Sequence, residues 1–202
     1  MKKLYENIEN INIKGGVDQL SDIVRVMDVS LQNIADNSEQ LVGYLSKYSS
    51  SNKGLQFEKV TLTASKLRDM LFDASYELNE MQNQIVTYQN KIYRYEDMAQ
   101  AAVSPNPYLV TKRPIMVDKT AVQFSRSDMI QVVAVLRNYS EKVYHHLKQI
   151  NRKKNEAALI WLDSQYKDFA SFVEMVTKNV INAIRTYEEY VIYLEEKIKE
   201  LG

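Results

Sequence analysis

The 202-residue chain contains no cysteine, which excludes a disulfide framework, a thiolate nucleophile and a metal site with cysteine ligands. It also carries no formal net charge, because 26 basic residues balance 26 acidic ones. A balanced charge argues against a general nucleic-acid binder and against a polybasic membrane anchor. The one compact basic cluster, residues 152–154, is explained as a solvated helix face.

Long apolar runs are absent as well. No stretch approaches the roughly 18 uninterrupted apolar residues that a membrane helix needs, so we expect no stable membrane insertion. A basic pair, Lys2 and Lys3, lies near the start of the chain, but no apolar core of signal-peptide length follows it. We therefore predict a protein that is cytoplasmic before any export and that would be secreted without a cleavable signal peptide.

Glycine and proline are scarce, with 5 and 3 residues, and their positions predict where helices break. Gly15 and Gly16 precede a long periodic segment, and Gly54 lies in a short polar stretch. All three prolines fall between residues 105 and 114. Long segments free of both residue types are what long helices require.

Apolar residues spaced three and four apart predict two helices in the N-terminal half. The first set, interrupted at Ser38, is Val17, Leu20, Val24, Met27, Leu31, Ile34, Leu41, Leu45 and Tyr48. The second set is Val60, Ala64, Leu67, Leu71, Ala74, Leu78, Met81, Ile85, Tyr88, Ile92, Tyr95, Ala99 and Ala102. The polar stretch YSSSNKG between them predicts a turn, so residues 1–103 should form an antiparallel hairpin. Ahead of it, the spacing of Leu4, Ile8 and Ile11 allows a short helix.

The C-terminal half, residues 127–202, repeats this plan. Its first apolar set is Val132, Leu136, Tyr139, Val143, Leu147 and Ile150. Its second combines Tyr166, Val173, Val180, Tyr187, Leu194 and Leu201 with a drifting row of Phe169, Val176, Ala183, Ile184, Val191 and Ile198. We expect Ser127 to cap the first helix, and Asp163 or Ser164 to cap the second.

Between the two hairpins, residues 104–126 combine the prolines with alternating apolar residues, which is typical of extended chain pressed on a surface. The predicted fold is all-α: two long antiparallel helical hairpins form a four-helix bundle, joined by this extended crossover. The three parts are also compatible with one compact unit.

Residues suited to catalysis or metal binding do not form a recognisable pattern. His145 and His146 are adjacent on a helix and point about 100° apart, so they cannot easily hold one ion together. Glu141 adds at most half a metal site, and neither histidine follows a glutamate by three residues as in di-iron bundles. Glycine-rich phosphate loops and nucleophile elbows are absent. We expect no enzyme, with no catalytic residue, metal or cofactor.

Among the 14 tyrosines of the chain, two groups stand out. Those in the periodic sets, such as Tyr88 and Tyr95, should be core aromatics with the hydroxyl at the rim. Tyr93, Tyr190 and Tyr193 lie off the main set. They are either scattered exposed aromatics or a binding surface.

Trp161, the only tryptophan, lies between the two C-terminal helices. It is either a core anchor for the turn or a recognition residue, and we expect an exposed turn here. The pattern Trp161-Leu162-Asp163, followed by Gln165, Tyr166 and Phe169, resembles the WXG (Esx-like) helical-hairpin superfamily linked to type VII secretion. It is similar to divergent members that carry Asp in place of the name-giving glycine, and the resemblance covers residues 117–202.

The resemblance implies a non-enzymatic protein whose hairpins pair into four-helix bundles and which is exported folded or escorts a toxin. Its partner-binding turn would comprise Trp161, Asp163, Tyr166 and Phe169. A protein partner, from the secretion machinery or co-secreted, would bind through helix–helix packing, and a homodimer is an alternative. The family's export motif, Tyr-x-x-x-Asp/Glu, can be read at Tyr93–Asp97 and at Tyr76–Glu80, about as often as chance gives. Two other classes stay open: an intracellular coiled-coil adaptor and a helical membrane-active, pore-forming protein.

Overall fold

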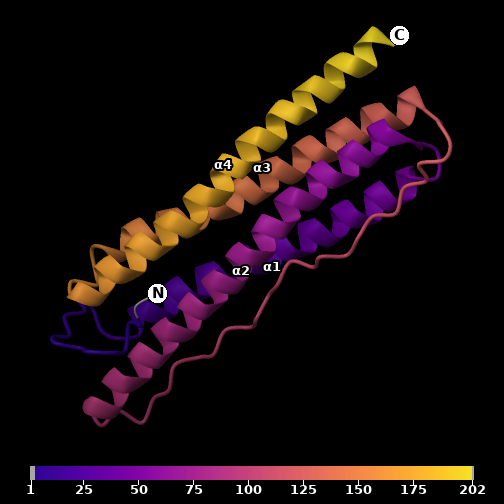
Figure 1. Cartoon of the computed structure of the whole chain (residues 1–202). Coiled ribbons are helices and arrows are strands. Elements are labelled where there is room, and N and C mark those ends of the chain that lie inside the picture. The colour runs from indigo at the N-terminus through magenta and orange to yellow at the C-terminus, as the bar shows by residue number, and fades with distance from the viewer. Residues whose placement is uncertain (1–2, 202) are drawn as a thin grey trace. The chain divides into compact units, whose positions relative to one another are not determined.

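The computed structural model describes residues 3–201, of which most are helical (Figure 1). The helices are α1 (Gln19–Tyr48), α2 (Leu55–Tyr95), α3 (Arg126–Ala157) and α4 (Ser164–Glu200). Helix packs on helix in the pairs α1–α3, α3–α4 and α2–α4, and no strand occurs among the described residues. The predicted all-α four-helix bundle is therefore confirmed.

The predicted apolar sets form the core along most of each helix. Most members of the four sets are buried, from Leu20 and Val60 near the start of the first two helices to Ile198 near the end of α4. Residues at steps of three and four share one helix face, and burying that face stabilises helices of this length. The prediction fails at the end of α2. The helix stops at Tyr95, which is 78% exposed, and Asp97 takes a left-handed backbone conformation at φ 50°.

The caps differ from the prediction for one helix and agree for the other. Ser125, two residues before the predicted Ser127, caps α3, since its hydroxyl oxygen accepts a hydrogen bond from the Asp128 amide at 3.4 Å. Asp163 caps α4, because its Oδ1 accepts a bond from the Gln165 amide at 3.0 Å. The Ser125 backbone amide in turn donates to Asn52 Oδ1, which ties the cap to the α1–α2 turn.

The predicted short helix over Leu4, Ile8 and Ile11 is wrong. Residues 3–16 form turns and extended chain, with Asn7, Gly15 and Gly16 at positive φ. Leu4 is fully buried, but its backbone amide donates to the side chain of Gln84 instead of to a helical carbonyl. Contacts with distant residues thus hold this segment in place of helical hydrogen bonds.

The chain divides into two compact units, and each takes a segment from both predicted hairpins. The Trp161 unit comprises Met1–Gln32, Ala74–Leu109 and His146–Asn179. The Tyr139 unit comprises Asn33–Asp73, Val110–His145 and Val180–Gly202. The two units are described separately below.

The crossover is extended, as predicted, and polar side chains hold its backbone. In the Trp161 unit, the Ala102 amide donates to Asn90 Oδ1 at 2.8 Å, and Asn79 donates to the Tyr108 carbonyl at 2.7 Å. In the Tyr139 unit, the Gly54 amide donates to the Asp118 carbonyl at 2.9 Å.

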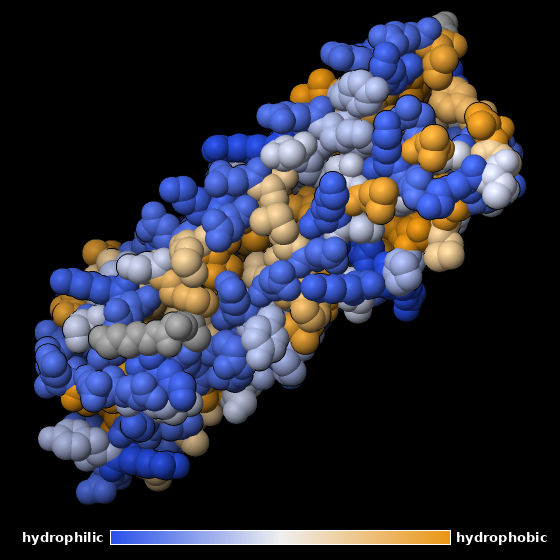
Figure 2. Space-filling model, viewed as in Figure 1, coloured by the Kyte–Doolittle hydropathy of each residue, from blue (hydrophilic) through white to orange (hydrophobic). Residues whose placement is uncertain are grey.

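The surface view shows mostly hydrophilic side chains with smaller hydrophobic patches between them (Figure 2).

Candidate functional site

In the Trp161 unit, Trp161 lies at the centre of an aromatic cluster in the α3–α4 turn. Its ring stacks on Tyr88 of α2 at a centroid distance of 5.5 Å and on Phe169 of α4 at 5.4 Å. Tyr166 contacts it edge-on at 6.3 Å. Trp161 is only 1% exposed, so the cluster is an interior feature of the unit.

Asp163 connects this cluster by hydrogen bonds. Its Oδ1 accepts bonds from Trp161 Nε1 at 2.8 Å and from the Gln165 amide, while Oδ2 accepts from the Tyr88 hydroxyl at 2.6 Å and the Asn12 amide at 3.2 Å. A buried carboxylate is tolerated when donors surround it in this way. Burial raises the pKa of the Tyr88 phenol, and its bond to Asp163 raises that pKa further.

The N-terminal segment closes the turn from outside. The Lys14 amide donates to the Ile160 carbonyl and the Leu162 amide to the Asn12 carbonyl, each at 2.7 Å, on either side of a β-bridge between Ile13 and Trp161. These backbone bonds hold residues 12–14 against the turn. The turn is exposed at Leu159 and Leu162, as expected, but Trp161 itself is buried. The segment that bonds to it lies far away in the sequence, and no local pattern indicates it.

The structure brings together all four residues predicted for the partner-binding turn, but it buries three of them. Trp161, Asp163 and Phe169 are buried, and Tyr166 is half-buried, with its hydroxyl donating to the Lys154 carbonyl at 3.0 Å. Their contacts are with one another and with this chain. The apolar side chains that the turn does expose are Leu159 and Leu162, which the sequence pattern did not single out.

The predicted export motif at Tyr93–Asp97 does not form one helical surface. Tyr93 is 3% exposed, its hydroxyl donates to Asp18, and it accepts a bond from Gln89 Nε2 at 2.8 Å. Asp97 lies past the end of α2. The second match, Tyr76 and Glu80, does share a helix face, and both residues line one shallow pocket in the Trp161 unit.

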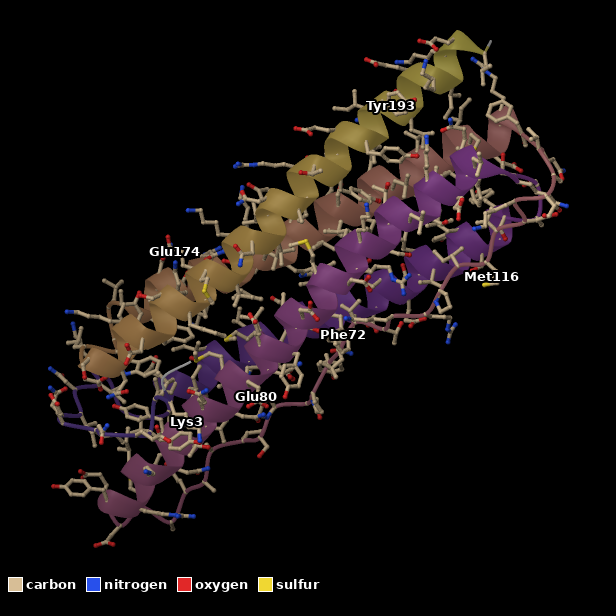
Figure 3. All side chains as sticks on the ribbon, in the orientation of Figure 1. Lys3, Phe72, Glu80, Met116, Glu174 and Tyr193 are labelled. Carbon is tan, nitrogen blue, oxygen red and sulfur yellow. The ribbon has the colours of Figure 1, made fainter. Side chains whose placement is uncertain are left out.

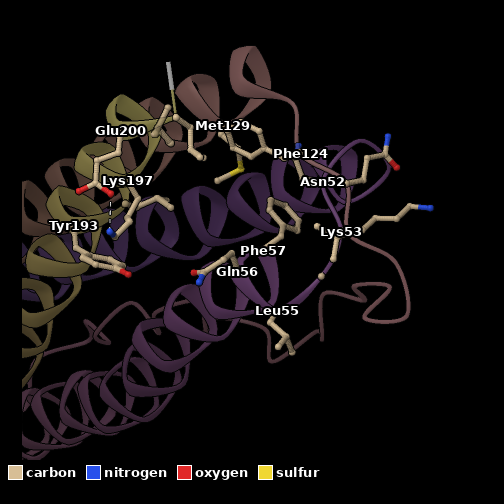
Figure 4. A pocket seen from close by; sticks show the side chains of 16 residues that line it. Asn52, Lys53, Leu55, Gln56, Phe57, Phe124, Met129, Tyr193, Lys197 and Glu200 are labelled. Carbon is tan, nitrogen blue, oxygen red and sulfur yellow. Dashed lines mark hydrogen bonds and ion pairs between the residues drawn. The ribbon is translucent and has the colours of Figure 1, made fainter.

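The Tyr139 unit contains an apolar groove that sequence reasoning missed (Figure 4). Its volume is about 560 Å³, within the range of ligand pockets. Its walls come from the α1–α2 turn, the end of the crossover, the start of α3 and the last turns of α4. The apolar lining includes Phe57, Phe124, Met129, Tyr193 and Ile198. Lys197 and Glu200 form an ion pair of 2.7 Å at the groove. Of the lining residues, the sequence suggested a binding surface only for Tyr193, because the four walls are far apart in sequence.

Two further properties of the described residues bear on function. Among residues 3–201, no group of three or more histidine, aspartate or glutamate side chains is placed to hold a metal ion. Within the same range, none of the helices combines the length and hydrophobicity of a membrane span.

Comparison with known proteins returned no relative. No family model, curated protein or solved structure matches this chain. The resemblance to the WXG superfamily therefore depends on the Trp161–Asp163 turn and the hairpin that contains it.

Proposed function

We propose that this chain is a non-enzymatic helical protein associated with type VII secretion, either a small secreted substrate or the targeting partner of a toxin effector. The α3–α4 hairpin, with its Trp161–Asp163 turn, carries the proposal. Two long helices flank a turn whose tryptophan and aspartate are joined by a 2.8 Å hydrogen bond. This is the hairpin arrangement that the sequence resemblance implies.

The way the turn is covered supports a self-contained bundle. Tyr88 and the segment around Asn12 satisfy the carboxylate of Asp163 within one chain. The N-terminal half thus takes the place that a second subunit has in a paired hairpin. A partner can then reach the exposed side chains of the turn, of which Leu159 and Leu162 are the large apolar ones. Exposed apolar side chains at a rigid turn are suited to anchoring a partner.

Secretion and partner recovery test the proposal. In the source organism, the chain should reach the culture medium only when the type VII ATPase is intact, or should co-purify with a toxin encoded beside it. Absence of both results contradicts the proposal. Leakage from liposomes would favour a membrane-active protein, and an intracellular partner alone would favour an adaptor.

A matched pair of leucines tests recognition at the turn. Leu162 and Leu62 are both 51% exposed, one in the α3–α4 turn and one on α2. Leu162→Ser should lower export or partner recovery, and Leu62→Ser should not. Neither should change the free energy of unfolding by more than about 0.5 kcal/mol. Equal effects of the two substitutions would count against the turn as the recognised element.

A further inference from the structure

In the Tyr139 unit, residues 110–113 of the crossover, Val-Thr-Lys-Arg, occupy a site built by α1 and α2. Val110 is buried, although most of the neighbouring crossover is not. Arg68 of α2 donates from Nη2 to the carbonyls of Thr111 and Arg113, at 2.6 and 3.0 Å. These bonds fix the backbone of the segment and do not depend on its side chains.

Arg68 is unusual because its guanidinium is buried, at 1% exposure, and its two Nη2 bonds go to peptide carbonyls. Its Nε and Nη1 have no hydrogen-bond partner. Burying such a charge is costly unless its donors are satisfied, and burial lowers the pKa of this guanidinium. The residue therefore depends on an extended peptide lying across it.

The side chains of the segment also have complements. The Thr111 hydroxyl bonds to Glu39 of α1, and Arg113 lies 3.9 Å from the same carboxylate. Lys112 pairs with Asp73 at 3.3 Å. Its Nζ also lies 4.2 Å from the ring centre of Phe72, which Figure 3 shows on α2. The hydroxyl and the two basic side chains are thus each matched, and the aliphatic side chain is buried.

We propose that Glu39, Arg68, Phe72 and Asp73 form a receptor for an extended peptide of the pattern aliphatic-Thr-Lys-Arg, occupied in cis by residues 110–113, and that a matching segment of another protein can displace them. Main-chain bonds give such sites affinity, and the side-chain contacts give them specificity. The receptor does not require that the chain be secreted.

Residues 110–113 can be displaced at low cost, because the crossover buries little apolar surface. Beyond Val110, the side chains of Met116 and Val122 are 80% and 94% exposed. Segments with few buried apolar contacts open locally at low cost, without unfolding the helices. The tethered segment has a high effective concentration, so a free peptide should bind weakly until the tethered copy is loosened.

A labelled peptide with the sequence of residues 107–116 tests the receptor by fluorescence anisotropy. The full chain carrying Lys112→Ala and Arg113→Ala should bind it at least about tenfold more tightly than the unsubstituted chain. Adding Asp73→Asn and Glu39→Gln should remove this gain. A peptide with glutamate in place of its lysine and arginine should not bind. Circular dichroism confirms that each variant is folded.

Met116→Ala is the matched control, because Met116 belongs to the same crossover and is exposed (Figure 3). It should bind the peptide no better than the unsubstituted chain. Hydrogen exchange gives a second measurement without substitutions: saturating peptide should speed exchange at the amides of residues 111–113. The proposal is overturned if the loosened chain binds no peptide, if it binds the charge-reversed peptide equally, or if exchange is unchanged.

Discussion

The α3–α4 turn and the α1–α2 turn are each joined to a distant segment by an antiparallel β-bridge, but their interiors are filled differently. An isolated antiparallel bridge joins each turn to a distant extended segment: Ile13 to Trp161 in one unit, and Lys53 to Gln123 in the other. The first turn is then filled by stacked rings around Asp163. The second leaves the apolar groove. A backbone bridge positions a covering segment, but large side chains are needed to exclude water beneath it.

The hydrogen bonds of the two turns also differ. In the Trp161 unit, four donors converge on one buried carboxylate. In the Tyr139 unit, Asn52 bridges the turn, accepting from the Ser125 amide at 3.0 Å and donating to the Tyr48 carbonyl at 3.2 Å. Gly54, at φ +94°, lets the crossover pass, since a Cβ there would lie 3.1 Å from the Ala121 carbonyl oxygen. The buried groups of the first turn thus stabilise the fold, whereas the second turn leaves an accessible groove.

The largest expected effect is a difference in how much the two turns contribute to the stability of the fold. Trp161→Ala should lower the free energy of unfolding by about 3–5 kcal/mol, because it empties a fully buried site. Phe124→Ala, at the half-exposed rim of the groove, should lower it by about 1 kcal/mol. Urea denaturation of the two variants measures both values. Equal losses of unfolding free energy would show that the two turns contribute equally to stability.

Asp163 tests whether the first turn depends on its hydrogen bonds. A helix cap alone is worth about 1 kcal/mol. Asp163→Ala should cost about 3 kcal/mol, because it leaves the Trp161 and Tyr88 donors buried without an acceptor. Trp161→Phe removes one of these donors and should cost about 2 kcal/mol. Thermal melting checks the order, and a loss of only 1 kcal/mol for Asp163→Ala would reduce its role to that of a cap.

Alkaline pH should weaken the fold through its buried tyrosines, of which Tyr139 and Tyr187 lie in the Tyr139 unit. Burial raises the pKa of Tyr139 and of Tyr187 above the ordinary value of 10.0. Below pH 10 both states keep these protons, so stability is unaffected. As pH rises above 10 the unfolded chain loses them first, and stability falls by about 1.4 kcal/mol per pH unit for each tyrosine. Unfolding in urea at pH 9 and pH 11 measures this loss.

Tyr139→Phe sharpens the pH test. This variant should lose less stability between pH 9 and pH 11 than the unsubstituted chain, because one titrating group is gone. Its stability at pH 7 should fall by about 1 kcal/mol, since the Tyr139 hydroxyl pairs with the buried Ser38 hydroxyl at 2.9 Å. An unchanged pH dependence would show that other groups govern alkaline unfolding.

The smallest effect on stability is expected in the groove itself. Val122→Ser should change the free energy of unfolding by no more than about 0.5 kcal/mol, because the side chain is already exposed. The same substitution should reduce the fluorescence of a bound apolar dye such as anilinonaphthalene sulfonate. A matched substitution of exposed Val29 on α1, outside the groove, should not. Equal dye binding by both variants would show that the groove is not the apolar binding site.

The sequence by itself determined the four helices and the crossover, and it narrowed the cap of α4 to Asp163 or Ser164. These features depend on local physics: apolar spacing at the helical period, the positions of proline and glycine, and a short polar side chain before a helix. The interruption at Ser38 was visible in the pattern, but its reason was not. Ser38 is buried and pairs with Tyr139, which lies 101 positions away in the chain.

Only the tertiary structure decided which residues meet around each turn. Periodicity places Tyr95 in the core and Tyr93 outside it, yet the structure reverses them. This part of α2 meets the turn at Asp18, whose carboxylate accepts a hydrogen bond from the Tyr93 hydroxyl. Trp161 is buried for a similar reason, because Tyr88 of α2 stacks on its ring and residues 12–14 bond the backbone on either side of it. The groove and the peptide receptor likewise combine segments that are distant in sequence, and such contacts leave no periodic trace in any one of them.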